Sequence, residues 1–180
     1  MSLPVWKKNR QVFEIRNPWW VYRKDDVILP GGKPGEYHYV HVAGSSMIVP
    51  VTKDNRFVLV KQYRYLCDRE SIEFPCGSVK PGSTYEETAH HELAEETGYQ
   101  CSRLQLVGEF NPYNGVTDEI CKVFIARDLS RAASSHPDET EQFEYLFPTF
   151  VEFDEMVRCN IIWDGMTLAA WSFLRPLFLQ

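Results

Sequence analysis

The pattern of apolar and polar positions changes near residue 44. Before it, "WWVYRKDDV" (19–27) and "EYHYVHV" (36–42) interleave aromatic and charged residues, which is typical of strands with one solvated face. The turn-forming stretch "LPGGKPGE" separates them, and a Lys-Asp-Asp turn can split the first segment into two short strands. Because two or three strands alone are marginally stable in water, we expect this ribbon to pack on the main domain or on a second subunit.

After residue 44 the apolar runs predict buried strands. They are "SMIVPVT", "RFVLVKQYRY", "SIEFP", "RLQLVGEF", "EICKVFIAR" and "FEYLFPTF". Helices are predicted at 84–97, near 152–158 and at 166–178. Strands that alternate with a few helices indicate α/β layers with mixed pairing. We therefore expect two domains, an N-terminal antiparallel β ribbon over 1–43 and an α/β domain over 44–180.

The helix at 84–97 has clear signals at both ends. It follows a Gly/Pro-rich loop, "CGSVKPGS". Ser83 is predicted to be its N-cap, with Glu86 as the reciprocal partner in a capping box. Gly98 supplies the left-handed residue that ends it.

The same helix concentrates negative charge, because "HHELAEETGY" (90–99) contains Glu92, Glu95 and Glu96. Like charges three or four residues apart on a helix repel by roughly 0.2–0.5 kcal/mol per pair. Glu92 and Glu96 stack one turn apart, and Glu95 lies beside them. Three converging carboxylates form a hard-oxygen site suited to Mg²⁺ or Mn²⁺. By spacing alone, a solvated acidic face balanced by basic side chains from elsewhere is the alternative.

Composition and charge narrow the classes of function. The 180 residues are 44% hydrophobic and 14% aromatic, which is ample for a buried core. A net charge of −6 argues against general binding to nucleic acid or anionic membranes, but not against small anionic substrates that a metal ion recruits. Five scattered cysteines without a C-x-x-C pair predict neither a disulfide framework nor a zinc site. With no signal-peptide pattern and a C-terminal apolar tail too short to span a membrane, we expect a cytoplasmic protein.

The segment from Gly77 to Tyr99 resembles the Nudix box, G-x5-E-x7-R-E-U-x-E-E-x-G-U, where U is a bulky apolar residue. The residues at matching positions are Gly77, Glu92, Leu93, Glu95, Glu96 and Gly98. Ser83 stands where the family has its first Glu, and His91 stands where it has Arg. We interpret this double change in one of two ways: a Ser/His hydrogen bond replaces the charged pair, or the two residues have separate roles. For His91, the alternative is an ordinary surface or packed histidine. These departures affect the groups that support the metal site more than its ligands.

The resemblance implies an α/β/α sandwich that hydrolyses a nucleoside diphosphate linked to another group. In this family a water attacks one phosphorus while divalent ions bridge the pyrophosphate oxygens. By position, Glu92 and Glu96 are the expected metal ligands, and Glu95 is the next ligand and a candidate catalytic residue. The backbone carbonyl of Cys76 is a further expected ligand. Two or three Mg²⁺ (or Mn²⁺) ions are expected with substrate.

The flanks resemble one branch of the family, the ADP-ribose and nucleotide-sugar pyrophosphatases, through "VLVKQYRY" and "SIEFPCGSVKPG". Arg64 is then a candidate for contact with substrate phosphate or ribose, and Glu73 would lie at the strand end beside the metals. Ordinary solvation at a strand edge is the alternative for both. The polar loop 128–142 is longer than a connection needs. In this branch a glutamate on that loop is the general base. Glu139 is the favoured match in this chain, and Glu141 is the alternative.

"NPYNGVTDE" (111–119) resembles the substrate loop of this branch, with Gly115 and Glu119 at matching positions. Asn114 replaces the proline associated with ADP-ribose preference, so GDP-mannose or another nucleotide sugar is comparably expected. Relatives of this branch are typically homodimers that exchange N-terminal strands, which the aromatic ribbon suits. The candidates for stacking on a base or packing at a dimer seam are Trp19, Trp20, Tyr22 and Tyr39.

These features predict a cytosolic Nudix hydrolase that cleaves a nucleoside diphosphate sugar or ADP-ribose to a nucleoside monophosphate and a sugar phosphate. A homodimer is expected, with neither nucleic acid nor membrane as a partner. One alternative is a Nudix-fold sensor that binds the nucleotide sugar without cleaving it, against which the intact acidic triad argues. The other is a pyrophosphatase of noncanonical nucleoside triphosphates, against which the N-terminal ribbon and the "VKQYRY" context argue.

Overall fold

The computed structural model of the chain describes residues 3–132 and 143–178. They form two compact units, one of Met1–Ala43 with Asn111–Glu119 and one of Gly44–Phe110 with Ile120–Gln180. The sequence places the loop 111–119 in the second domain, whereas the structure groups it with the first unit. The reason is backbone pairing with β3 (Pro34–His41), because the backbone N–H of Val40 donates to the carbonyl of Val116 at 2.8 Å.

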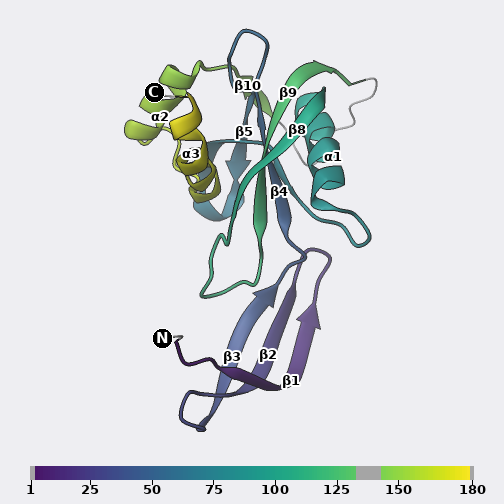
Figure 1. Cartoon of the computed structure of the whole chain (residues 1–180), viewed down its shortest axis with the longest axis vertical. Coiled ribbons are helices and arrows are strands. Elements are labelled where there is room, and N and C mark those ends of the chain that lie inside the picture. The colour runs from purple at the N-terminus through teal and green to yellow at the C-terminus, as the bar shows by residue number, and fades with distance from the viewer. Residues whose placement is uncertain (1–2, 133–142, 179–180) are drawn as a thin grey trace. The chain divides into compact units, whose positions relative to one another are not determined.

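The first unit contains a three-stranded antiparallel sheet in the order β1-β2-β3 (Figure 1). Its strands are β1 (Lys7–Arg16), β2 (Val21–Ile28) and β3 (Pro34–His41). The predicted split at the Lys-Asp-Asp turn is wrong, because β2 continues through it. Asp25 in the middle of this segment pairs with Gln11 of β1 and Tyr37 of β3, so both neighbouring strands hold it extended. The strand β1 was not predicted.

The second unit contains two sheets. Its strands are β4 (Ser45–Pro50), β5 (Leu59–Arg64), β6 (Arg69–Glu73), β7 (Cys76–Ser78), β8 (Tyr99–Phe110), β9 (Cys121–Arg131) and β10 (Glu144–Leu146). The larger sheet has the order β7-β4-β9-β8, in which only the β4–β9 pair is parallel. The smaller one, β10-β5-β6, is antiparallel. The prediction of a mixed sheet is confirmed.

Helices cover both faces of the larger sheet, with α1 on one side and α2 and α3 on the other (Figure 1). Their bounds are α1 (Tyr85–Thr97), α2 (Phe150–Arg158) and α3 (Gly165–Phe178). Alternate residues of β4 serve two cores: Met47 packs with Phe153 of α2 and Trp171 of α3, and Ile48 packs with Leu93 of α1. This is the predicted α/β/α sandwich. In the described part of the chain no helix is long and apolar enough to cross a membrane.

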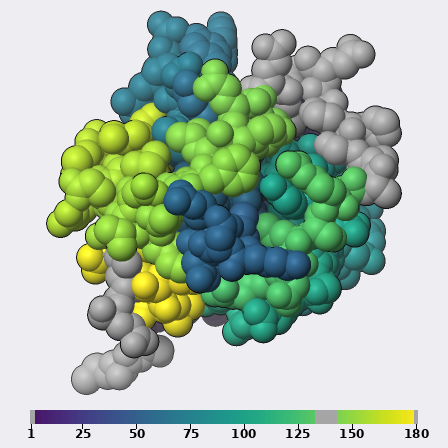
Figure 2. All heavy atoms as spheres, turned by 90° about the horizontal axis from the view of Figure 1, so that it is seen from above, coloured from purple at the N-terminus to yellow at the C-terminus, as the bar shows by residue number. Residues whose placement is uncertain are grey.

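Figure 2 looks onto the end of the second unit at which β4 ends. The turn after β4, in dark blue, lies beside the green and teal surface of β9 and β8. This end is opposite the start of β4, where β7 pairs with it.

Candidate active site

The helix α1 begins one residue later than predicted. Thr84 is its N-cap: its Oγ1 accepts a hydrogen bond from the backbone N–H of Glu87 (3.1 Å), and the Glu87 carboxylate accepts one from the backbone N–H of Thr84 (2.8 Å). Ser83 and Glu86 have the same spacing as Thr84 and Glu87, so the sequence offers two equivalent capping boxes. The backbone N–H of Ser83 instead closes a turn in the preceding loop. Gly98 ends the helix with φ 68°, as predicted.

The three glutamates of α1 lie in different environments. Glu96 is only 5% exposed, and its Oε2 accepts a hydrogen bond from the backbone N–H of Cys76 at 3.3 Å. Glu92 and Glu95 are partly buried beside His91, whose Nδ1 lies 2.9 Å from Glu95 Oε2 and 3.9 Å from Glu92 Oε1. One ligand atom each of His91, Glu92 and Glu95 lies within 4.8 Å of the others, and Glu96 is not among this group. The two carboxylates of the group are oxygen donors of the kind that a hard divalent cation prefers.

Gly77 provides the space that the Glu92 carboxylate occupies. A Cβ atom at this position would lie 2.0 Å from Cδ of Glu92 and 2.3 Å from both carboxylate oxygens. The sequence predicts a loop here, but the segment is the strand β7, in which Gly77 pairs with Ser46 and Cys76 with Met47 of β4. The pairing brings a bare stretch of backbone against Glu92, which is the close approach that a glycine permits.

A pocket of about 260 Å³ lies beside these acids. It is lined by Ser78, Lys80, Ser83, Glu87, Thr88, His91 and Glu92. The two residues that depart from the Nudix box, Ser83 and His91, therefore border one cavity. His91 contacts Glu95, and no hydrogen bond joins it to Ser83 among the interactions of the described residues. The arrangement favours separate roles for the two.

Arg64 and Glu73 form a bidentate ion pair across the smaller sheet. Arg64 Nε donates to Glu73 Oε1 at 2.8 Å, and Nη2 donates to Oε2. Glu73 is 4% exposed, whereas the Arg64 side chain is about half exposed. The hydrogen bonds to Glu73 raise the pKa of Arg64, and the charges of Asp164 and Glu96 act in the same direction. The pair engages one edge of the guanidinium, so the two N–H groups of Nη1 and the second N–H of Nη2 remain for another anion.

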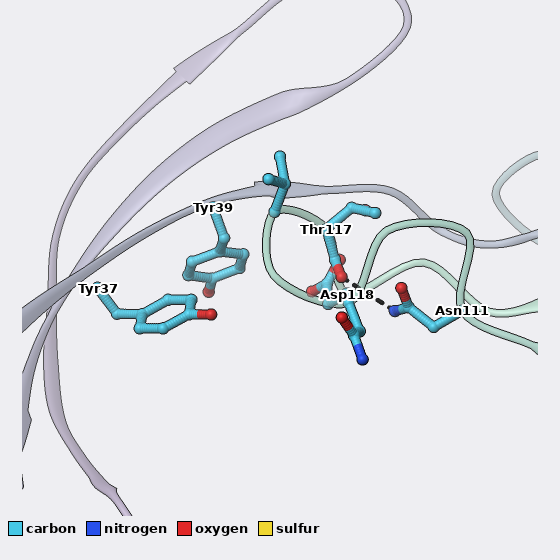
Figure 3. A pocket seen from close by; sticks show the side chains of 7 residues that line it. Tyr37, Tyr39, Asn111, Thr117 and Asp118 are labelled. Atoms are coloured by element: carbon cyan, nitrogen blue, oxygen red, sulfur yellow. Dashed lines mark hydrogen bonds between the residues drawn. The ribbon is translucent and has the colours of Figure 1, made fainter.

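The first unit has its own pocket, of about 430 Å³ (Figure 3). It is lined by Tyr37, Tyr39, Asn111, Asn114, Val116, Thr117 and Asp118. The hydroxyl of Tyr37 donates to the carbonyl of Gly115 at 3.4 Å. The side-chain amide of Asn111 donates to the carbonyl of Thr117 at 3.0 Å, and its Oδ1 is buried without a hydrogen-bond partner in the described residues. Its lining, among the residues that the structure describes, includes no lysine or arginine.

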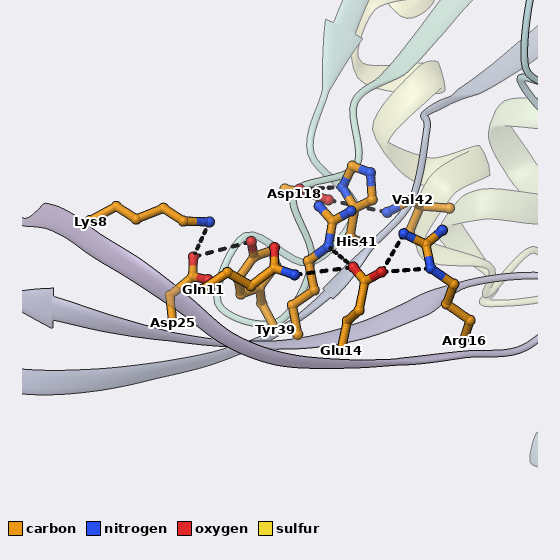
Figure 4. Close-up of polar contacts among 10 residues, drawn as sticks. Lys8, Gln11, Glu14, Arg16, Asp25, Tyr39, His41, Val42 and Asp118 are labelled. Atoms are coloured by element: carbon orange, nitrogen blue, oxygen red, sulfur yellow. Dashed lines mark hydrogen bonds and ion pairs between the residues drawn. The ribbon is translucent and has the colours of Figure 1, made fainter.

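A buried carboxylate holds the hydroxyl of Tyr39 (Figure 4). Asp25 is 6% exposed, and its Oδ2 accepts from the Tyr39 hydroxyl at 3.2 Å and from Lys8 Nζ at 2.8 Å. The Lys8 pKa is raised, chiefly by the hydrogen bond to Asp25. Asp118, across the pocket, accepts from His41 Nδ1 at 2.7 Å and from the backbone N–H of Val42 at 3.2 Å.

The remaining predicted residues are distributed as follows. Gly115 lies in the pocket loop of the first unit, and the backbone N–H of Glu119 donates to Thr117 Oγ1 at 3.1 Å. Trp19 is 78% exposed and does not line the pocket. Glu139 and Glu141 lie outside the described residues. The sequence missed the pocket-lining Tyr37, Asn111, Thr117 and Asp118, although alternate tyrosines on a strand and a loop marked by family resemblance were the available signals.

The sandwich, with a cluster of carboxylates gathered on α1, defines an α/β protein of the class expected from the sequence. The model of the NUDIX domain matches residues 42–165. The chain therefore belongs to the NUDIX family.

Several curated proteins are similar to this chain. The "Methanol dehydrogenase activator" of Bacillus methanolicus is 31% identical over 152 residues, which cover 84% of this chain and 82% of that protein. The "ADP-ribose pyrophosphatase" of Bacillus subtilis is 33% identical over 152 residues with the same coverage of each chain. The "GDP-mannose pyrophosphatase" of Escherichia coli is 27% identical over 144 residues, which cover 76% and 75%.

A solved structure described as "Crystal structure of ADP compounds hydrolase" has the same fold, with a TM-score of 0.85. It covers 98% of this chain and 96% of its own, at 19% identity. At that identity the likeness concerns the fold alone.

Proposed function

We propose that this Nudix hydrolase cleaves the pyrophosphate bond of a nucleoside diphosphate sugar, of the ADP-ribose, ADP-sugar or GDP-mannose type, releasing a nucleoside monophosphate and a sugar phosphate. The observation that carries the proposal is the acidic cluster on α1, with Glu92 seated against Gly77 and Glu96 buried against the backbone of β7. The relatives named as ADP-ribose and GDP-mannose pyrophosphatases support the substrate class.

The proposed metal ligands are Glu92 and Glu96, with Glu95 and the backbone carbonyl of Cys76 completing the set. Two or three Mg²⁺ (or Mn²⁺) ions, when bound with substrate, supply Lewis-acid polarisation of the phosphoryl oxygens and lower the pKa of a bound water. Neighbouring residues restrict the positions of the Glu96 and Glu92 carboxylates. The Cys76 N–H holds the Glu96 carboxylate, and β7 limits where Glu92 can lie.

Arg64 is proposed to bind a phosphate oxygen through the edge of its guanidinium that Glu73 does not occupy. Glu73 then acts by holding the guanidinium in place, and its burial makes that orientation rigid. The proposed general base is Glu139, or alternatively Glu141; Glu95 is a further catalytic candidate.

The pocket of the first unit is proposed to hold the base or terminal sugar rather than a phosphate. The hydroxyl proton of Tyr37 is committed to Gly115, so the Tyr37 oxygen offers lone pairs to a ligand. The Tyr39 hydroxyl donates to Asp25 and is also within hydrogen-bonding reach of Lys8 and Arg23. Asp118 adds a carboxylate. A lining of aromatic faces and acceptors without a lysine or arginine suits a ring that carries N–H or O–H donors. Gly115 and Glu119 belong to the loop that shapes this pocket, and Trp19 remains a stacking candidate.

A homodimer is part of the proposal, since the first unit exposes several large apolar side chains. Among them are Trp6, Val12, Phe13, Ile15, Trp19 and Trp20. A second copy of the chain would cover these side chains and the outer edge of β1. We place the protein in the cytoplasm, where its five free cysteines would stay reduced.

A second candidate is a regulatory protein that binds a nucleotide sugar without turnover, because a relative covering most of this chain is named as an activator. The two are separated by incubating purified protein with Mg²⁺ and ADP-ribose, ADP-glucose, GDP-mannose or an oxidised nucleoside triphosphate, and resolving the products by chromatography. Release of nucleoside monophosphate from a diphosphate sugar, lost in Glu96→Gln and kept in Glu86→Gln, supports the hydrolase. Binding without products indicates the regulator, and release of pyrophosphate indicates a triphosphate pyrophosphatase.

A further inference from the structure

We propose that the second unit carries an anion site at the end of its larger sheet, away from the acidic helix, that takes the phosphoryl group of a small phosphomonoester. The site is a pocket of about 210 Å³. It is lined by Val51, Thr52, Lys53, Asn55, Arg103, Arg127 and Asp128. This volume is below that of pockets for drug-sized ligands, which matches a phosphate with a few attached atoms. The proposal does not depend on the hydrolase activity.

The register of β4 separates this pocket from the acidic cluster. Cys76, whose N–H holds Glu96, pairs with Met47 of β4. The pocket begins at Val51, four residues farther along the chain, a span of about 13 Å at the rise of an extended strand. Figure 2 faces this end of the sheet, where the dark-blue turn after β4 meets β9.

The arrangement of charge in the pocket is unfavourable without an anion. Arg103 of β8 and Arg127 of β9 are direct cross-strand partners, and like charges at such positions destabilise a sheet. Lys53 adds a third cation from the turn. Among the described residues of the lining, Asp128 is the one acid, and it lies 3.6 Å from Arg103 Nε. Lys53 and Arg127 form no ion pair with any described residue, so the described lining has an excess of positive charge.

Two local features restrain the cations. The guanidinium of Arg127 lies over the ring of Phe178, 5.5 Å from its centroid. Asp128 has φ 55°, a conformation uncommon for residues other than glycine, and from there its carboxylate reaches Arg103. Planar guanidinium groups held in this way match the oxygens of a phosphoryl group, to which they can donate in pairs.

The test uses inorganic phosphate as the probe on the full-length protein, in EDTA and at ionic strength held constant with NaCl. Calorimetry and thermal unfolding are measured for the wild type, Arg103→Gln, Arg127→Gln and the control Arg158→Gln, an exposed arginine on α2 outside the pocket. The wild type and the control are expected to show saturable phosphate binding and a rise in Tm beyond that in chloride. Each pocket variant is expected to bind at least about tenfold more weakly, because a charge-assisted hydrogen bond is lost.

Three results would overturn the proposal. Phosphate could stabilise the wild type no more than chloride does, or the pocket variants could bind it as tightly as the control. Alternatively, Arg64→Gln and not Arg127→Gln could abolish binding, which would place the phosphate at the proposed catalytic site. Lys53→Gln, a change on an exposed turn, provides a pocket variant should an arginine variant fail to fold. Because substrate and divalent ions are absent, failure here is distinct from failure of the proposed hydrolysis.

Discussion

Gly77→Ala should remove most of the catalytic activity while leaving the fold intact. The new Cβ would lie 2.0 Å from Glu92 Cδ, whereas ordinary contact begins at 3.4 Å, so the carboxylate has to move by roughly 1.4 Å. A displacement of about 1 Å in a group that positions the reaction can cost about 10²-fold in rate. Gly77 is not among the residues with positive φ, and the obstacle is the end of a flexible side chain. We therefore expect the free energy of unfolding to change by less than about 1 kcal/mol.

The assay compares kcat, the Mg²⁺ concentration for half-maximal rate and the Tm in the wild type, Gly77→Ala and Gly165→Ala. Gly165 begins α3, and a Cβ there would meet nothing within 4 Å, so this variant controls for the glycine-to-alanine change itself. The expected result is a loss of rate and weaker Mg²⁺ activation in Gly77→Ala alone. Wild-type turnover and Mg²⁺ dependence in Gly77→Ala would refute the placement of Glu92 as a metal ligand.

Other predictions concern packing, acid stability and the pocket of the first unit. Leu93→Ala should lower the free energy of unfolding by about 2–5 kcal/mol in denaturant titrations, since Leu93 is fully buried between α1 and the larger sheet; a change below about 0.5 kcal/mol would contradict that packing. The hydrogen bonds from Arg175 lower the pKa of Asp154, so the stability from this pair is present above about pH 4 and is lost as the pH falls through the lowered pKa. Asp154→Asn should accordingly reduce the Tm at pH 7 by roughly 5 °C, and the Tm of the variant should fall less steeply between pH 4 and 2 than that of the wild type. An equally steep fall in the variant would contradict a stabilising role of the Asp154–Arg175 pair. Tyr37→Phe should raise KM about tenfold with kcat nearly unchanged, because a ligand acceptor is lost; a fall in kcat alone would argue against a binding role.

Much of the second unit could be predicted because its signals are local. The unbroken apolar runs of β4 and β9 indicate strands buried on both faces, and the two cores on either side of them are the outcome. The start of α1 could not be chosen, because Ser83 and Thr84 each have a glutamate three residues later. In the structure the backbone N–H of Ser83 bonds to the carbonyl of Lys80 in a turn of the preceding loop, and Thr84 is the N-cap.

The errors arise where pairing with distant residues overrides local character. The strand β1 is rich in charged residues, and its ion pairs with β2, such as Arg10 with Asp26, are not visible in a single segment. The strand β7 lies in a Gly/Pro-rich stretch and exists because β4 pairs with it. The loop 111–119 joins the first unit through hydrogen bonds of Val116 and Asp118 to Val40, which lies far earlier in the chain. The pocket of that unit combines β3 with this loop, so the signals in each segment did not show that the two meet.

The most direct test of the proposed function is the Mg²⁺ dependence of hydrolysis in the wild type and in Glu96→Gln, with ³¹P NMR to identify the products. Glu86→Gln is the matched control, since Glu86 is an exposed acid in the first turn of the same helix. We predict that the wild type and the control convert ADP-ribose or GDP-mannose to a nucleoside monophosphate and a sugar phosphate, and that EDTA stops both. Glu96→Gln should be slower by at least about 10²-fold. Wild-type turnover in Glu96→Gln, or hydrolysis that persists without a divalent ion, would contradict the proposed metal site on α1.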